Sequence, residues 1–264
     1  MTAPDALIGY SGFIGTNLQR ARRFDALFNS TNIEEVRDRS FELLVCAGAS
    51  SLKWFANAHP DEDRAQIDRL IQALARVDAR KIILISTIEV YPDKIGVDEE
   101  TVVDESRLEP YGLHRRELER FVQSHFAKSL IVRLPGVFGP GLKKNVIYDL
   151  LHGNYSYAAA STSQLQFYDV RRLWSDLQVA CAHRLPIVNI ATEPISLHDI
   201  ATLCATGEGA VRYGAGEVQH DMRTRYASAW QHTGRYLYSR QETLTDLAAF
   251  VADHAGSIRT ATTR

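Results

Sequence analysis

The sequence predicts an α/β fold, in which helices cover a doubly wound parallel sheet and a smaller lobe follows at the C-terminal end. Near-continuous apolar runs, typical of strands buried on both faces, occur at residues 41–46, 81–85 and 130–134. Segments with apolar residues at helical spacing separate these runs. A further short apolar strand, at residues 6–8, leads directly into a glycine-rich turn. Alternation of this kind is characteristic of a parallel sheet built by crossover connections.

The glycine-rich turn joins the first strand to a helical pattern. In this context Gly9 permits a tight turn, Gly12 lets a pyrophosphate approach the backbone, and Gly15 lets the helix pack closely on the sheet. The start of the helix offers free N–H groups and the positive end of its dipole to phosphates. The spacing predicts a dinucleotide site, and a plain strand–turn–helix connection is the alternative. The residues expected to contact the nucleotide are Gly9, Ser11, Gly12, Phe13, Ile14 and Gly15.

The end of the second strand bears on the choice of nucleotide. A short basic helix is expected at 19–23 and the strand at 26–28, followed by Asn29 and Ser30. An acidic residue here selects NAD by binding the adenine ribose. Because no carboxylate is present to repel a 2′-phosphate, NADP is weakly preferred, and NAD stays open. The connection from 29 to 40 holds only roughly a dozen residues, so we expect an abbreviated adenine half.

The next run, 41–50, ends in Ala47, Gly48 and Ala49, whose small side chains would let a cofactor lie against the backbone; tight packing is the alternative. A helix is expected to begin at Pro60. Three acidic residues in its first turn complement the helix dipole, namely Asp61, Glu62 and Asp63. Its apolar stripe consists of Ile67, Leu70, Ile71 and Leu74.

Two further strands carry polar or conformationally special residues to the same edge of the sheet. The strand at 81–85 is followed by Ser86, Thr87 and Glu89, and a helix at 110–125 opens with Tyr111. The strand at 130–134 ends in the segment 135–141, whose Pro135 and Val137 we also place beside the cofactor.

Beyond residue 141 the alternation loosens. We expect a helix at 146–151, a strand at 164–170, a helix ending near 184, a strand at 186–190, a helix capped at Ser196, a strand at 210–213 and a closing helix at 241–255. Residues 1–140 are therefore assigned to a dinucleotide-binding domain. Residues 141–264 form a small mixed α/β substrate lobe, with 186–201 returning to the main sheet.

Composition narrows the possible partners. The 264 residues include 45% hydrophobic residues and carry a net charge of -2. A near-neutral chain gives no sign of nucleic acid or an anionic membrane as a partner. The three cysteines, Cys46, Cys181 and Cys204, are scattered, so neither a disulfide framework nor a metal site is indicated. No signal peptide or membrane-spanning run is apparent, so a cytoplasmic protein is expected.

In their order, these motifs resemble the extended short-chain dehydrogenase/reductase family, which includes sugar-nucleotide epimerases, dehydratases and reductases. The resemblance runs from Leu7 to about Ala201 and implies a Rossmann-like domain. It rests on the glycine turn, the Ser86–Thr87 strand end, the Tyr111 helix, the Pro135–Pro140 segment and the strand at 189–191. It implies that Thr87 and Tyr111 polarise a substrate carbonyl. The fourth residue after the tyrosine, normally a lysine that holds the nicotinamide ribose, is here Arg115.

The departures from the family pattern matter for mechanism. Arg115 keeps the positive charge that favours a phenolate, but its planar fork has a different reach; an exposed surface arginine is the alternative. Glu89 stands where the family's dehydratases have a catalytic base, but Ile88 replaces their acid, so Glu89 is either chemical or a solvated loop carboxylate. His114 is expected to be solvated unless it relays a proton.

Two other departures concern the substrate: Gly136 and Leu165 stand where an Asn and an Arg often bind the substrate diphosphate. Lys143, Lys144, Arg171 and Arg172 are possible electrostatic substitutes for them.

The predicted function is an NAD(P)-dependent oxidoreductase that transfers a hydride at a hydroxyl or keto carbon of a small sugar-like or sugar-nucleotide-like substrate. The proposed catalytic residues are Tyr111, Thr87, Arg115 and Glu89, with no metal. The alternatives are an epimerase with no net redox change and a non-catalytic NAD(P)-binding sensor on the same fold. The resemblance also implies a homodimer formed through the helices that begin at Pro60 and Pro110.

Overall fold

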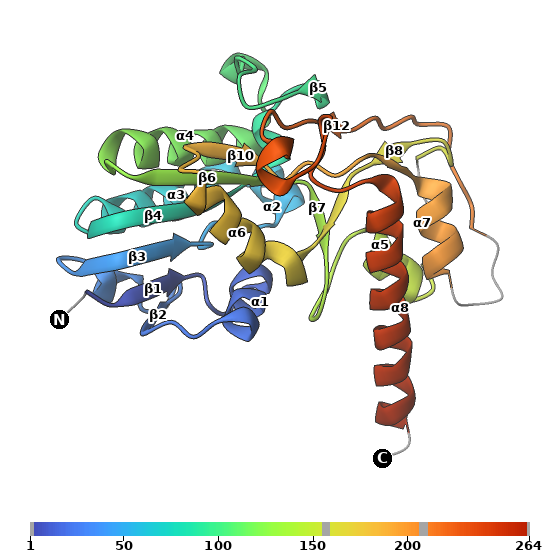
Figure 1. Ribbon diagram of the computed structural model, residues 1–264, viewed down its shortest axis with the longest axis horizontal. Coiled ribbons are helices and arrows are strands. Elements are labelled where there is room, and N and C mark those ends of the chain that lie inside the picture. Colours follow the sequence, from blue (N-terminus) through green and yellow to red (C-terminus); the bar gives the residue numbers. More distant parts are fainter. Residues whose placement is uncertain (1–2, 155–158, 206–210, 263–264) are drawn as a thin grey trace. The chain divides into compact units, whose positions relative to one another are not determined.

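Six parallel strands form the predicted sheet in the order β10-β6-β4-β3-β1-β2 (Figure 1). The computed structural model describes residues 3–154, 159–205 and 211–262, the last eight by their backbone only. The strands are β1 (Asp5–Ile8), β2 (Ala26–Phe28), β3 (Ser40–Cys46), β4 (Asp78–Thr87), β6 (Ser129–Leu134) and β10 (Ile187–Asn189). The doubly wound fold predicted from the sequence is confirmed.

The chain reverses its direction of winding between β2 and β3, which lie on opposite sides of β1. Ligands of doubly wound sheets bind at such a switch point, outside the carboxyl ends of the strands. The connection from β2 to β3 contains only the 3-10 turn η1 (Ile33–Val36). The expected shortening of this half is therefore present, and it leaves the carboxyl ends of β1 and β3 side by side.

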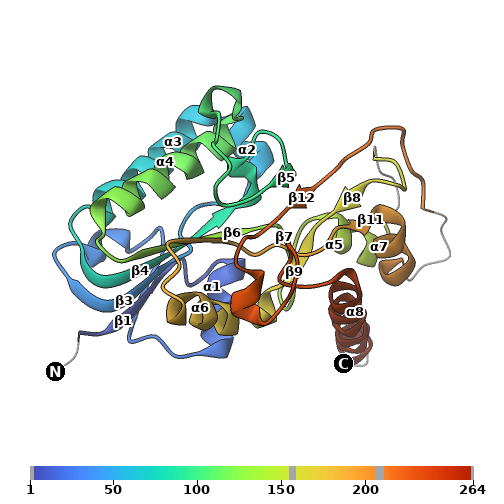
Figure 2. The same cartoon turned by 45° about the horizontal axis from the view of Figure 1, so that its top comes forward.

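Helices cover both faces of this sheet (Figures 1 and 2). The helices α3 (Pro60–Leu74) and α4 (Pro110–His125) lie on one face, with α2 (Lys53–Ala58) in contact with both. The helices α1 (Phe13–Ala21) and α6 (Leu173–Ala182) lie on the other. The short helix expected at 19–23 is wrong in its start, because Gly12 ends the turn and the helix begins at once with Phe13. The helix α2 was not predicted.

The main core lies between the sheet and the pair α3–α4. Its members come from the stripe predicted for the helix that begins at Pro60, from the inner face of α4 and from the apolar strands, and include Ile67, Leu70, Leu74, Leu118, Val122, Ile8, Leu44, Ile82 and Leu84. Each is 6% exposed or less. Together, β1–β4, α1–α4, β6, α6 and β10 belong to the first of two units, formed by Met1–Asp93, Val97–Leu134 and Arg172–Asn189.

The second unit comprises Lys94–Gly96, Pro135–Arg171 and Ile190–Arg264. Its pairs of short strands are β7 (Gly136–Phe138) with β9 (Phe167–Asp169), β8 (Gln164–Leu165) with β11 (Ile195–Ser196), and β5 (Ile95–Val97) with β12 (Asp221–Met222). Its helices are α5 (Val146–Leu151), α7 (Leu197–Cys204) and α8 (Arg240–Thr262). A second apolar core includes Phe138, Ile147, Leu150, Ile200, Leu247 and Phe250.

Several details of this unit differ from expectation. The strand expected at 164–170 is two strands, because Gln166 turns inward and donates to the carbonyls of Thr192 and Met222. The strand expected at 210–213 is not formed by residues 211–213, and Ala210 lies outside the described residues. The chain changes unit after Leu134 rather than at residue 140, and within 186–201 only β10 joins the main sheet. Across the described ranges, no helix is long and apolar enough to cross a membrane.

Candidate functional site

The three glycines of the turn after β1 have different surroundings. Gly9 has a φ of +86°, and a Cβ there would lie 2.2 Å from the Ala47 carbonyl oxygen of the neighbouring strand end. At Gly15 a Cβ would lie 2.1 Å from the Gly9 carbonyl oxygen. Both glycines are therefore required by close backbone packing. Gly12 is not: its backbone is extended, and its Cβ would meet only the Gly9 oxygen, at 3.4 Å.

The turn fits a phosphate group by its donors as well as by its shape. Gly12 is the N-cap of α1 and supplies no capping side chain. The amides of Phe13, Ile14 and Gly15 have no hydrogen-bond acceptor among the described residues. Amides at a helix N-terminus bind anions through their N–H groups and the helix dipole. The residues present therefore fit the pyrophosphate of a dinucleotide.

The predicted adenine-side residues come together at the end of β2. Asn29 Nδ2 donates to Ser11 Oγ at 3.3 Å, which links the second strand to the glycine turn. Arg69 of α3, which sequence reasoning missed, donates to the Ser30 carbonyl at 3.1 Å and pairs with Glu34 at 2.9 Å. Arg69 therefore lies beside Ser30, and the Glu34 carboxylate balances its charge.

At the end of β3 the small residues pack tightly. The Ala47 amide donates to the Ile8 carbonyl at 2.9 Å. A Cβ on Gly48 would lie 2.8 Å from Ile8 Cγ2 and 3.6 Å from a Leu70 methyl group. Close packing by itself thus accounts for Gly48, and contact of Ala47, Gly48 and Ala49 with a cofactor stays a prediction.

Tyr111 and Thr87 form the centre of the site. Tyr111 lies in the first turn of α4 and is 8% exposed, and its amide donates to Asn57 Oδ1 at 3.0 Å. A Cβ on Gly112 would lie 2.2 Å from the Glu89 carbonyl oxygen, so this glycine lets α4 approach the chain just after Thr87. Burial raises the pKa of Tyr111, as do the charges of Glu89 and Asp63, whereas Arg115 and a hydrogen bond with the Thr87 side chain oppose that rise.

Arg115 is buried against Tyr111, not exposed at the surface, so the surface alternative is wrong. It is 3% exposed, and its guanidinium carbon lies 3.9 Å from the centroid of the Tyr111 ring. Its terminal nitrogens donate to the Asp63 carboxylate and, at 2.6 Å, to the Ser50 carbonyl. Its buried Nε has no partner among the described residues. This donor has the capacity to bind a further acceptor, as a ribose hydroxyl would be.

The neighbouring His114 is also buried, at 4% exposed, which corrects the expectation of a solvated histidine. Its Nδ1 lies 2.7 Å from the Asp63 carboxylate, the same oxygen that Arg115 contacts. Burial would raise the pKa of Asp63, but the hydrogen bonds from Arg115 and His114 outweigh burial and lower it. Asp63 was read from the sequence only as a helix-dipole residue.

Glu89 is engaged by a residue that the sequence did not reveal. Lys53, the first residue of α2, places its Nζ 2.8 Å from Glu89 Oε2. The Glu89 side chain is 19% exposed, whereas that of Lys53 is 48% exposed. The Glu89 amide also donates to Thr87 Oγ1 at 3.2 Å. Glu89 is thus a partly buried, paired carboxylate rather than a freely solvated one.

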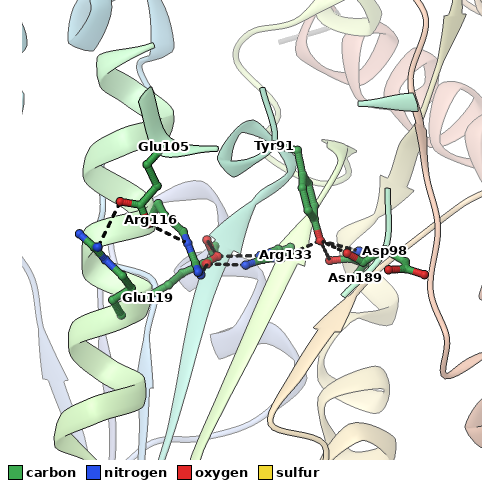
Figure 3. Close-up of polar contacts among 9 residues, drawn as sticks. Tyr91, Asp98, Glu105, Arg116, Glu119, Arg133 and Asn189 are labelled. Atoms are coloured by element: carbon green, nitrogen blue, oxygen red, sulfur yellow. Dashed lines mark hydrogen bonds and ion pairs between the residues drawn. The ribbon is translucent and has the colours of Figure 1, made fainter. Parts of the chain in front are cut away.

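A buried polar network surrounds Arg133 and Glu119 (Figure 3). Arg133 of β6 contacts Glu119 of α4 at 2.6 and 2.9 Å, and the two side chains are 2% and 0% exposed. Arg133 also donates to the Tyr91 hydroxyl at 2.6 Å, and Ser86 Oγ donates to Glu119 at 2.6 Å. Burial opposes the charge on Arg133, but Glu119 outweighs burial and raises its pKa. The network ties the strand ends of β4 and β6 to α4.

Pro135 and Val137 belong to the second unit, so their position beside a cofactor stays a prediction. A Cβ on Gly136 would lie 2.7 Å from the Phe167 ring, so that ring occupies the space that an asparagine would need. Arg171 is paired with the buried Asp169 at 2.6 Å and with Asp253 at 3.2 Å. Within the described ranges, no cluster of three or more metal-ligating side chains occurs.

Comparisons with known proteins identify the family of the chain. A family model described as the NAD dependent epimerase/dehydratase family matches residues 22–156. No curated protein sequence matches the chain.

Three similar solved structures each align with almost the whole of this chain. The chain is 18% identical to "MoeE5 in complex with UDP-glucose and NAD", covering 96% of this chain and 99% of that one, with a TM-score of 0.73. It is 12% identical to the UDP-N-acetylglucosamine 4-epimerase of Methanobrevibacter ruminantium M1, solved with UDP-N-acetylmuramic acid, covering 97% and 99% with a TM-score of 0.77. It is 18% identical to RMD from Pseudomonas aeruginosa, complexed with NADPH, covering 95% and 98% with a TM-score of 0.72. At these identities the similarity establishes the fold.

Proposed function

Because the chain belongs to the NAD-dependent epimerase/dehydratase family, we propose that it is an NAD(P)-dependent oxidoreductase. Its substrate would be a small sugar-like or sugar-nucleotide-like molecule that reacts at a hydroxyl or keto carbon. The observation that carries this proposal is the buried Tyr111 ring beneath the Arg115 guanidinium, with Thr87 at the end of β4, which packs against α4. A protein that only binds a nucleotide needs neither hydroxyl in that position.

The chemistry divides between the nucleotide and the protein. A bound nicotinamide nucleotide supplies or accepts a hydride. The protein's own residues handle the proton: Tyr111 donates to the substrate oxygen or accepts from it, and Thr87 hydrogen-bonds the same oxygen. Arg115 stabilises the Tyr111 phenolate once the proton has left, and its free Nε is the donor we assign to the nicotinamide ribose. Glu89, held by Lys53, completes the polar edge of the site.

The proton chemistry at Tyr111 serves both candidate reactions. Burial raises the pKa of Tyr111, and a phenol is protonated at neutral pH even at its ordinary pKa. A reductase uses Tyr111 as a proton donor to the carbonyl oxygen, whereas an epimerase uses it in both directions within one turnover. The epimerase stays the alternative because the family description and several similar structures name that activity.

The nucleotide would occupy the glycine turn and the ends of β2 and β3. Similar structures hold NAD in one case and NADPH in another. We favour NADP because no carboxylate directly follows β2, where Asn29 and Ser30 stand. The second unit is proposed to bind the substrate. The Phe167 ring fills the space beside Gly136, and Arg171 is paired with Asp169. Both observations favour a substrate whose diphosphate is held by other residues, or a substrate that has no diphosphate.

A non-catalytic NAD(P) sensor is the second candidate, favoured by the arginine at position 115.

Purified protein should be incubated with NADPH or NADH and a panel of nucleotide sugars and free keto sugars. A reductase consumes one nucleotide per product, whereas an epimerase changes the sugar without net consumption. A nucleotide that binds tightly without turnover, and whose binding releases a partner protein, would establish the sensor instead.

The mechanism is tested by Tyr111→Phe, which removes one hydroxyl with little change in volume. Loss of a general acid typically lowers kcat by a factor of ~10² to 10⁴, while nucleotide affinity should persist. The matched control is Tyr91→Phe, which deletes a buried phenol bonded to Arg133 instead. It should lower stability by about 1–3 kcal/mol but leave the turnover of folded protein near wild type. Turnover by Tyr111→Phe at the wild-type rate would overturn the mechanism.

A further inference from the structure

Asp63 is a buried carboxylate that binds two consecutive side chains of another helix. It lies in the first turn of α3, is 2% exposed, and faces His114 and Arg115 of α4. A buried charge is retained only when it is paired and hydrogen-bonded, and removing one partner of such a pair is strongly destabilising. The Asp63 carboxylate is both paired and hydrogen-bonded, and both of these partners belong to the first unit.

The contacts of Arg115 define the plane of its guanidinium. One terminal nitrogen bonds to Asp63 and lies 3.4 Å from the Tyr111 carbonyl, and the other bonds to the Ser50 carbonyl at 2.6 Å. With its two ends fixed, the flat group lies over the Tyr111 ring, 3.9 Å from the centroid. A guanidinium can form a directed ion pair and stack on an aromatic face at once, whereas an ammonium is a single point charge.

We propose that Asp63 is a positioning residue that holds the Arg115 guanidinium over the face of Tyr111, so that the charge at position 115 acts on the phenol through the ring. This inference rests on the proposed role of Tyr111 as proton donor and acceptor. It explains how an arginine can serve at a position where the family resemblance implies a lysine. The charge is anchored from α3 and from the end of β3 rather than by the nucleotide.

Because of the charges around Tyr111, the direction in which its pKa changes can test the proposal. Arg115 lowers the pKa of Tyr111, whereas Asp63 and Glu89 raise it, and Glu89 is itself paired with Lys53. If Asp63 acted only as a nearby negative charge, its removal would lower the pKa of Tyr111. If Asp63 positions Arg115, its removal releases the guanidinium from the ring and raises that pKa. The two roles therefore predict opposite changes.

The experiment is a pH titration of tyrosinate absorbance in nucleotide-free protein. Subtracting the titration of a matching Tyr111→Phe protein isolates Tyr111 from the other tyrosines. Asp63→Ala should raise the pKa of Tyr111 by on the order of one pH unit. In an Arg115→Met background, the same Asp63→Ala change should instead lower it, because only the direct charge effect remains. A fall in both backgrounds would overturn the proposal.

Two further variants test the proposal if the Asp63→Ala protein does not fold. Asp63→Glu keeps the charge and moves the carboxylate by one methylene, so positioning predicts a raised pKa of Tyr111, whereas a wild-type value would overturn it. Asp63→Ala with Arg115→Met removes both buried charges and supplies the reference state. These measurements need no substrate, so a protein without redox turnover but with the expected titrations would refute the proposed function and leave this inference standing.

Discussion

At the residue scale, Gly12 is the position where a substitution should weaken nucleotide binding without weakening the fold. Its backbone is extended and its Cβ direction is open, whereas Gly9 and Gly15 are enclosed by neighbouring backbone atoms. Gly12→Val should therefore fold normally but place its branched side chain where a pyrophosphate must approach. We expect nucleotide affinity to fall by about two orders of magnitude or more, which calorimetry measures directly.

The contrast variant is Gly15→Ala, whose Cβ would lie 2.1 Å from the Gly9 carbonyl oxygen. It should lower the melting temperature, whereas Gly12→Val should leave it unchanged. Unaltered nucleotide affinity in a folded Gly12→Val protein would refute the placement of the cofactor.

The limits of sequence reasoning are also clearest among residues. The glycine turn and Tyr111 were found because each has a local signature. Asp63 lies in the first turn of its helix as predicted, but its burial was not predicted, although it lies four, seven and eleven positions before Ile67, Leu70 and Leu74, on the buried face of the helix. That spacing was the available signal. Its partners on α4 and the Glu89–Lys53 pair depend on contacts across 36 to 52 positions, which periodicity does not encode.

At the element scale, α7 shows how local chemistry fixes a helix start. The Ser196 side chain accepts from the Asp199 amide, and the Asp199 carboxylate accepts from the Ser196 amide, forming a complete capping box. The predicted cap at Ser196 is confirmed. Ser196→Ala should cost about 1 kcal/mol of stability in urea unfolding. Thr202→Ala, at an exposed position on the same helix, is the control and should have little effect.

The same cap predicts a pH dependence. Burial would raise the pKa of Asp199, but Ser196 and the charge of Arg240 outweigh burial and lower it. Because the folded-state pKa is lowered, the stabilisation is present above the unfolded value of about 4 and is lost as pH falls through the folded value. The stability difference between wild type and Asp199→Asn should therefore shrink on acidification. A difference that is constant across this range would contradict the assignment.

Elements without a local signature were missed or displaced. The helix α2 has only six residues and no side-chain cap, so it offered no periodicity to detect. It nevertheless carries Lys53 and Asn57, which contact Glu89 and the Tyr111 amide. The connection from β3 to α3 therefore contributes to the site more than its composition indicated.

At the scale of the whole molecule, a parallel sheet follows from the sequence pattern, whereas its strand order and the exact stretches of each unit do not. Long apolar runs predict strands that are buried on both faces, and the helical segments between them predict crossover connections. Together they predict a parallel sheet. The second unit is assembled from separate stretches, including Lys94–Gly96. Its strands have two or three residues, too short for a repeating pattern to reveal.

Assembly is the remaining expectation at this scale. The predicted homodimer uses α3 and α4, but most apolar side chains of both helices are buried in the core, and Leu113 and Phe121 of α4 are only partly buried. The outer surface carries the Arg64–Glu117 pair, which joins the two helices at 2.7 and 2.9 Å. A stable interface buries about 1,600 Å² in total, so polar side chains of both helices must take part.

We expect light scattering at micromolar concentration to show twice the 29.6 kDa chain mass. Ala65 and Gln72 are exposed and lie seven residues apart on the same side of α3. Changing both to Glu sets like charges against each other across a two-fold interface and should give monomers. Val102→Glu adds charge at a residue that is 92% exposed outside these helices, and should leave the dimer intact. A monomeric wild type, or a dimer that survives the double change, would rule out this interface.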